Sequence, residues 1–195
     1  DELADNINFA KCVRAECDFV ASFEHKAQLH FTPNEGDDGI YAIAVEVGNY
    51  LTLGQLLNDD PSVVARNEFI TKVIKELLDI TVSLNEQEVY HVCFAPSNIL
   101  LRKNDNAVRL LCHGSFYRKL DQDVLYDGVE EYVAPEVLNG GEIDGRSDVY
   151  SLGKFIAYLY DSSGLPFELK KIIEKATAAN PEDRFDSVAS LRDTI

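Results

Sequence analysis

The stretch that decides the fold reads Tyr90-His91-Val92-Cys93-Phe94-Ala95-Pro96-Ser97-Asn98-Ile99-Leu100-Leu101. His91 and Asn98 stand seven positions apart in it and enclose a mostly apolar segment. The run that follows Asn98 is typical of a short buried strand. The pattern predicts a loop that leads into a strand at 98–101, and a second strand at 108–111 after a polar turn.

Hydrophobic periodicity predicts a chain that is mainly helical on both sides of this loop. The broadest apolar stripe covers residues 62–84 and is typical of a core helix. The helices expected in all cover residues 3–23, 51–57, 62–84, 147–160, 166–178 and 187–194. Two further strands are expected at 27–31 and 40–47, joined by a turn-rich loop.

Composition and charge exclude several classes of function. The chain has 195 residues, 46% apolar and 27% charged, an ordinary globular balance. The net charge of −16 makes nucleic acid and anionic lipid poor partners. No apolar run approaches the roughly 18 residues that span a bilayer, so no direct membrane insertion is expected.

The four cysteines lack zinc or disulfide spacing, which is typical of a cytoplasmic protein. Because the chain begins at Asp1 and lacks Met, we expect a fragment or a processed product.

Five further motifs surround the loop at 90–101. Glu16 precedes His25 by nine residues near the start of the chain. The others follow the loop, and they read Cys112-His113-Gly114, Ala134-Pro135-Glu136, Ser147-Asp148-Val149-Tyr150-Ser151-Leu152-Gly153 and Asn180-Pro181-Glu182-Asp183-Arg184-Phe185. In this order and spacing the chain resembles the protein kinase superfamily, in the style of bacterial serine/threonine kinases. The resemblance extends from the kinase αC helix to the last helix, over nearly the whole chain.

The resemblance implies an α+β, mainly α fold with a kinase-like C-lobe. Residues 1–48 would form a reduced N-lobe of the αC helix and two strands, and residues 49–195 the C-lobe. The first three strands of a kinase would be missing, together with their Gly-rich loop and phosphate-binding Lys. The αG helix is also expected to be missing, because the interval from Asp148 to Arg184 has room for one helix after the first.

The resemblance also implies that the positions of kinase chemistry are replaced. Val92 stands at the Arg position of the catalytic loop, Cys93 at the catalytic Asp and Ala95 at the Lys. Cys112 and His113 replace the first two residues of the metal-binding D-F-G. Phosphoryl transfer needs a positioned base and Mg²⁺ held by oxygen ligands, which thiols do not supply. We therefore expect no enzyme, no cofactor, no metal, and no binding of ATP or Mg²⁺.

The positions that hold a kinase lobe together are kept, and the resemblance gives them structural roles. These positions are Glu16, His91, Asn98, Gly114, Glu136, Asp148 and Arg184. Glu136 and Arg184 are expected to form a buried two-pronged ion pair. Asp148 is expected to accept hydrogen bonds from the loop backbone, to stabilise its helix N-terminus, or both. His91 is expected to pack, and Asn98 to hydrogen-bond the loop. Cys93 and Cys112 are expected to lie close together, as packing residues or as a redox pair.

The expected function is that of a catalytically inactive pseudokinase, a protein-interaction or regulatory scaffold. It would work in the cytoplasm or as the cytoplasmic domain of a larger protein. The alternative is an atypical ATP-dependent phosphotransferase whose nucleotide site is completed by a missing N-terminal segment or by a partner. A protein partner is expected to bind apolar surface left exposed near αC, the helix at 62–84 and the helix at 147–160.

Overall fold

The computed structural model describes residues 31–35, 41–45, 49–65, 67–110, 129–161 and 166–195. The helices there are α2 (Leu53–Asp59), α3 (Asn67–Asn85), α4 (Pro135–Leu138), α5 (Gly145–Asp161), α6 (Phe167–Ala176) and α7 (Val188–Arg192). The strands are β1 (Phe31–Glu35), β2 (Tyr41–Val45), β3 (Tyr50–Thr52), β4 (Ile99–Arg102) and β5 (Val108–Leu110). Short 3₁₀ helices are η2 (Pro61–Ala65), η3 (Pro96–Asn98), η4 (Glu130–Tyr132) and η5 (Pro181–Asp183).

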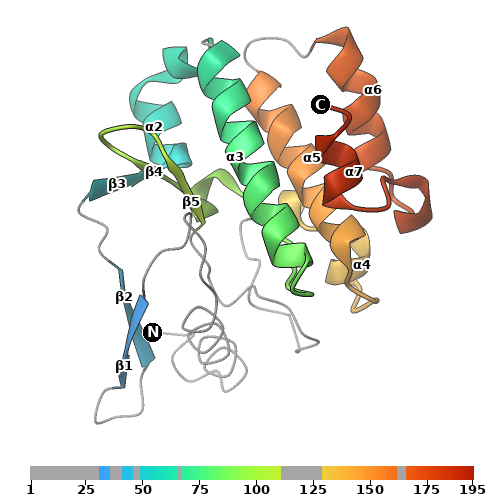
Figure 1. The fold of residues 1–195 in the computed structure, drawn as a ribbon, viewed down its shortest axis with the longest axis horizontal. Helices are drawn as coiled ribbons and strands as arrows, with labels where there is room; N and C mark the ends of the chain where they lie inside the picture. The colour runs from blue at the N-terminus through green and yellow to red at the C-terminus, as the bar shows by residue number, and fades with distance from the viewer. Residues whose placement is uncertain (1–30, 36–40, 46–48, 66, 111–128, 162–165) are drawn as a thin grey trace.

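Two long helices, α3 and α5, lie side by side and carry the main hydrophobic core (Figure 1). The apolar stripe predicted for α3 faces this core, with Ile70, Val73 and Leu77 fully buried. From α5 the core takes Val149, Leu152, Phe155, Ile156 and Leu159. Gly153 lets α6 approach α5 closely, because a Cβ there would lie 2.8 Å from Thr177 Cγ2 and 2.9 Å from Ala176 Cβ.

A small antiparallel sheet in the order β3-β4-β5 lies beside α2 and η3 (Figure 1). β4 is the central strand, with Leu51 opposite Leu101 and Leu100 opposite Arg109. The prediction of two strands around residues 98–101 and 108–111 is therefore correct to within a residue or two. The prediction that a helix begins at residue 51 is wrong. Leu51 pairs in β3, and Thr52 caps α2 by accepting from Gln55 N at 3.0 Å.

The bounds of two other predicted elements also change. α3 begins at Asn67 and not at residue 62, because Pro61 opens a 3₁₀ turn whose start is held by Ser62 N donating to Asp60 Oδ1 at 3.2 Å. β1 covers Phe31–Glu35, part of which was expected to be a loop, and pairs antiparallel with β2. Proline is tolerated in β1 because, among the described residues, this sheet consists of β1 and β2, so each strand is an edge.

Several expectations fall on residues outside the described ranges. These include the helix at 3–23, the first residues of the strand at 27–31, and the boundary between 48 and 49, which stays a prediction. In the described part, α6 is the single α-helix between α5 and Arg184, as expected from the interval. None of the helices in the described part has the length and apolar character that a membrane span requires.

Candidate functional site

Hydrogen bonds to side chains in the first turns of α5 anchor the loop at 90–95. Asp148 is fully buried, and its Oδ1 accepts a hydrogen bond from Val92 N at 2.7 Å. Its Oδ2 accepts from Asn85 Nδ2, also at 2.7 Å. Three residues further along α5, Ser151 Oγ accepts from Phe94 N at 2.7 Å. Side chains on one face of α5 therefore fix alternate residues of the loop backbone, which is the anchoring role expected for Asp148.

Val92 occupies an unusual backbone conformation within this loop. Its φ of 56° lies in the left-handed region, which is costly for a β-branched residue. The hydrogen bond from its N–H to Asp148 and the complete burial of its side chain offset this cost. Backbone hydrogen bonding and side-chain packing thus both fix the conformation of the loop at Val92.

Val92, Cys93 and Ala95, the positions where the resemblance implies replaced catalytic residues, share one apolar environment, which we call the loop cluster. It consists of Val92, Cys93, Ala95, Tyr132, Val133, Ala134 and Val137, all buried. The first three come from the loop, and the other four from η4, α4 and the residues between them. The loop cluster is separate from the main core. The side chains of Val92, Cys93 and Ala95 therefore pack this loop against the segment at 132–137.

The Cys93 thiol has low reactivity in this position. Its side chain is 1% exposed, and burial raises the pKa of the thiol to about 12. Asn98 Nδ2 donates to Cys93 O at 3.1 Å and approaches Cys93 Sγ at 3.6 Å, which opposes the shift only in part. A protonated thiol is neither a good base nor a good nucleophile at neutral pH.

His91 and Asn98 lie where the sequence places them, at the two ends of the loop. His91 is buried, and its ring stacks on Phe94 with 4.7 Å between centroids. Asn98 is 5% exposed and hydrogen-bonds the loop carbonyl of Cys93. Packing for His91 and backbone bonding for Asn98 are the interpretations that the sequence favoured over catalysis or metal binding.

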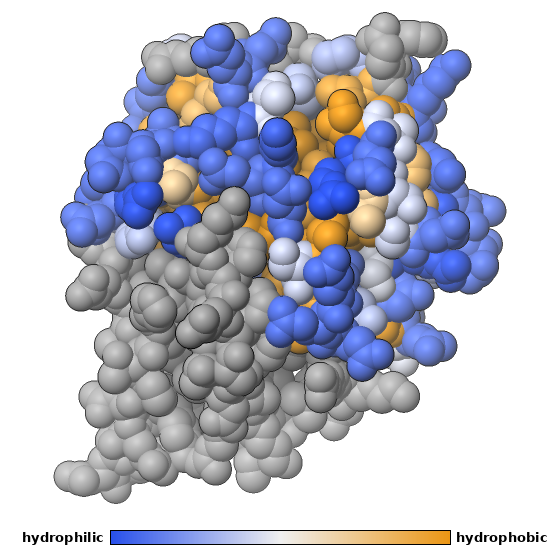
Figure 2. Space-filling view, viewed as in Figure 1, coloured by the Kyte–Doolittle hydropathy of each residue, from blue (hydrophilic) through white to orange (hydrophobic). Residues whose placement is uncertain are grey.

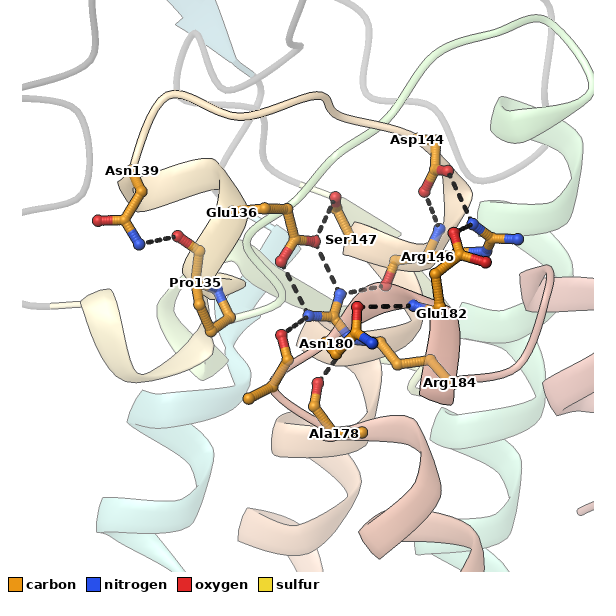
Figure 3. A network of polar contacts seen from close by, with 11 residues as sticks. Pro135, Glu136, Asn139, Asp144, Arg146, Ser147, Ala178, Asn180, Glu182 and Arg184 are labelled. Carbon is orange, nitrogen blue, oxygen red and sulfur yellow. Dashed lines mark hydrogen bonds and ion pairs between the residues drawn. The ribbon is translucent and has the colours of Figure 1, made fainter.

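Glu136 and Arg184 form the predicted two-pronged ion pair, shown in Figure 3. Arg184 Nη1 lies 2.7 Å from Glu136 Oε1, and Nη2 lies 2.8 Å from Oε2. The remaining guanidinium donors reach the carbonyl oxygens of Ala178, Arg146 and Ala179. The Arg184 side chain has no exposed surface, so all five of its N–H donors are used inside the protein.

The electrostatics of the ion pair tie it to the loop cluster. Burial opposes ionisation of Glu136, but hydrogen bonds from Arg184 and Ser147 outweigh it and hold the pKa of the carboxyl below its usual value. The Arg184 guanidinium also lies over the ring of Tyr150, 4.9 Å from its centroid. Tyr150 packs against the loop cluster. Tyr150 therefore contacts both the ion pair and the loop cluster.

Four predicted site residues, Glu16, Cys112, His113 and Gly114, lie outside the described residues. The expected proximity of Cys93 and Cys112 therefore stays a prediction. Among the described residues, no group of His, Cys, Asp and Glu side chains is arranged to hold a metal ion.

Sequence reasoning missed two residues of the site, Asn85 and Ser151. Asn85 ends α3 and also donates to Val89 O at 3.1 Å, which closes the turn that leads into the loop. A signal for Ser151 was available, since it follows Asp148 by three positions and shares its helix face. The hydrogen bond from Asn85 to Asp148 joins residues 63 positions apart, and no local sequence pattern predicts it.

Comparison with known proteins identifies the family. The family model for the protein kinase domain matches residues 2–189. The chain is 25% identical to serine/threonine-protein kinase PknB of Mycolicibacterium smegmatis over 98% of its own length. It is 28% identical to serine/threonine-protein kinase Pkn1 of Myxococcus xanthus over 65% of its length. It spans only 36% and 23% of these two relatives, respectively.

A solved structure shows the same fold. The Mycobacterium tuberculosis PknI kinase domain matches with a TM-score of 0.73 and 21% identity, over 99% of this chain and 80% of that one. The predicted fold class, a kinase-like C-lobe with a reduced N-lobe, is therefore confirmed.

The expectation that the chain is not an enzyme is contradicted, because the matched family is one of enzymes and the relatives are named serine/threonine-protein kinases. That expectation extended losses at a few positions, such as Cys93, to the whole domain, whereas phosphoryl transfer depends on many positioned groups. By its motifs, its fold and its match over residues 2–189, this chain belongs to the protein kinase domain family.

Proposed function

We propose that this kinase-family domain serves as a protein-interaction and regulatory scaffold, with its catalytic loop kept as a structural element. The observation that carries the proposal is the loop cluster, in which Val92, Cys93 and Ala95 are all buried against the segment at 132–137. Base catalysis needs a group within hydrogen-bond reach of the substrate proton and with a pKa near the working pH. The Cys93 thiol, 1% exposed and with a pKa of about 12, does not meet the second condition.

The retained contacts support the same proposal. Glu136 with Arg184, and Asp148 with the loop backbone, hold the lobe together without requiring nucleotide or metal. A fold of this kind hosts catalysis in some proteins and binding in others, so the site has to decide between them. In this proposal the domain works in the cytoplasm or as the cytoplasmic domain of a larger protein. The spacing of its four cysteines, which is not typical of disulfide-bonded proteins, supports this location.

Two exposed hydrophobic side chains give the proposal a test. Leu138 on α4 and Tyr158 on α5 are 48% and 41% exposed. We expect the domain to capture a protein from its native source, and the double variant Leu138→Asp, Tyr158→Asp to lose it. The control Lys170→Asp introduces the same side chain at an exposed position of α6 and should retain the partner. Circular dichroism of all three proteins confirms folding.

The captured protein should form a complex of fixed stoichiometry with the purified domain, since a specific interface buries at least about 1,000 Å² in total. Equal capture by the wild type and both variants would place any partner on another surface. No stoichiometric complex with any protein would contradict the scaffold proposal.

The family match favours a second candidate function, an ATP-dependent phosphotransferase whose nucleotide site is completed by a partner or by a further segment of chain. Thermal unfolding with MgATP separates the two candidates. A ligand at 100 times its dissociation constant stabilises a protein by about 2.7 kcal/mol. A saturable rise in Tm, together with transfer of radiolabelled phosphate to the captured protein, would make the phosphotransferase the better assignment.

A further inference from the structure

The described residues form a half-open groove of about 520 Å³ between α3, α6 and the C-terminal turn after α7. Its apolar lining includes Ile74, Leu78, Leu169, Ile172 and Ile195. Figure 2 shows hydrophobic side chains gathered between α3 and the C-terminal turn, with hydrophilic side chains around them. Concave, mainly apolar sites of roughly 300–1,000 Å³ with a few polar groups are typical of small-molecule binding.

The two cations that line this groove differ in their ion pairing. Arg192 Nη1 lies 3.5 Å from Asp79 Oδ1 and its Nη2 lies 3.3 Å from Asp193 Oδ1, so carboxylates neutralise this guanidinium. Lys75 also lines the groove and is exposed, and no carboxylate of the described residues lies within ion-pair distance of it. The neighbouring acid on α3, Glu76, pairs with Lys72 at 3.9 Å. In a chain with a net charge of −16, Lys75 is thus a cation that lies beside an apolar surface and lacks an ion-pair partner among the described residues.

We propose that this groove binds a small hydrophobic anion, whose apolar body fills the groove and whose acidic group pairs with Lys75. The volume sets the size class of the ligand, the lining sets its apolar character, and Lys75 sets the sign of its charge. The site lies at α3, α6 and α7, whereas the loop cluster lies between the catalytic loop and the residues of η4 and α4. It therefore stands independently of the scaffold proposal.

The test uses two fluorescent probes with the same ring system. 1-Anilinonaphthalene-8-sulfonate carries one negative charge, and N-phenyl-1-naphthylamine is its uncharged counterpart. We expect the anionic probe to saturate a single site more tightly than the neutral probe. Lys75→Met should weaken the anionic probe about two- to fivefold, the range of a partly exposed ion pair, and leave the neutral probe unchanged. The control Lys170→Met removes an exposed lysine of the same helix layer that does not line the groove, and should change neither.

The position of the site is tested by filling the groove. Ile172→Trp or Leu169→Trp should weaken the binding of both probes. Two variants are made because the test needs only one that folds, as judged by circular dichroism. Equal effects of Lys75→Met and Lys170→Met on the anionic probe would overturn the charge assignment. Unchanged probe binding in a folded Trp variant would overturn the site itself. A concentration-dependent dimer that excludes the probes would show that a second copy of the chain covers the groove instead.

Discussion

Replacing Glu136 with Gln should cost about 3–5 kcal/mol of unfolding free energy, the range for breaking a buried ion pair. Gln keeps the shape of the side chain but removes the charge that balances Arg184. The Arg184 side chain is 0% exposed and that of Glu136 is 13% exposed, so water cannot replace the lost carboxylate at the guanidinium. The upper part of the range is expected because Arg184 cannot turn away without leaving the carbonyl oxygens of Ala178 and Ala179 unpaired.

The matched control is Glu182→Gln, which makes the same change in an exposed ion pair. Glu182 contacts Arg146 at the same end of α5, but its side chain is 71% exposed. Exposed pairs contribute about 0–1 kcal/mol, so this variant should be close to the wild type. Urea unfolding followed by circular dichroism measures both. With a slope of about 2 kcal/mol/M, Glu136→Gln should lower the midpoint by about 1.5–2.5 M.

A double-mutant cycle separates the ion pair from other effects of substitution. The combination of Glu136→Gln with Arg184→Met should cost less than the sum of the two single changes, because neither charge is then left alone. If Glu136→Gln proved no more destabilising than Glu182→Gln, or if the two single effects simply added, the buried pair would not be what stabilises the lobe.

Two further predictions concern protonation and reactivity at the loop. Burial raises the pKa of Asp148 from 3.8 to about 7, so its contribution to stability is present at low pH and is lost as the pH rises toward 7 and above. Asp148→Asn should therefore flatten the fall in the urea midpoint between about pH 4 and 8, and an unchanged profile would show that other groups, such as neighbouring Asp144, set it. Cys93 should resist alkylation by iodoacetamide at pH 8 in the native protein and react after denaturation, as peptide mass spectrometry can check; rapid native labelling would mean that the loop cluster opens.

The sequence predicted those parts of the site that rest on motifs with fixed spacing. Glu136, Asp148 and Arg184 could be assigned in advance because each sits in a short motif that specifies both residue type and structural context. The resulting contacts, the ion pair and the bond to Val92 N, lie where those motifs place them. Helices with a broad apolar stripe, above all α3, were equally accessible, because burial of one face produces the periodicity.

Long-range pairing and local backbone strain could not be predicted from the sequence in the same way. Leu51 belongs to β3 because it pairs with Leu101, and its own neighbours in the sequence are compatible with a helix. The left-handed φ of Val92 contradicts its intrinsic preference and depends on Asp148, 56 residues away. The loop cluster likewise forms across distant segments, so the sequence predicted Cys93 as a packing residue but not the partners at 132–137 against which it packs.

The unfolding of Cys93→Asp as a function of pH tests the central claim, that the catalytic loop is a packed structural element. An aspartate at this position restores the carboxylate of the family motif, but here it would lie in the loop cluster at a site 1% exposed. An ionised buried carboxylate is strongly disfavoured, so the variant should lose stability relative to Cys93→Ala, and the loss should grow from pH 5 to pH 8. Equal midpoints for the two variants at both pH values would mean that the position accepts a charge, and would contradict the claim.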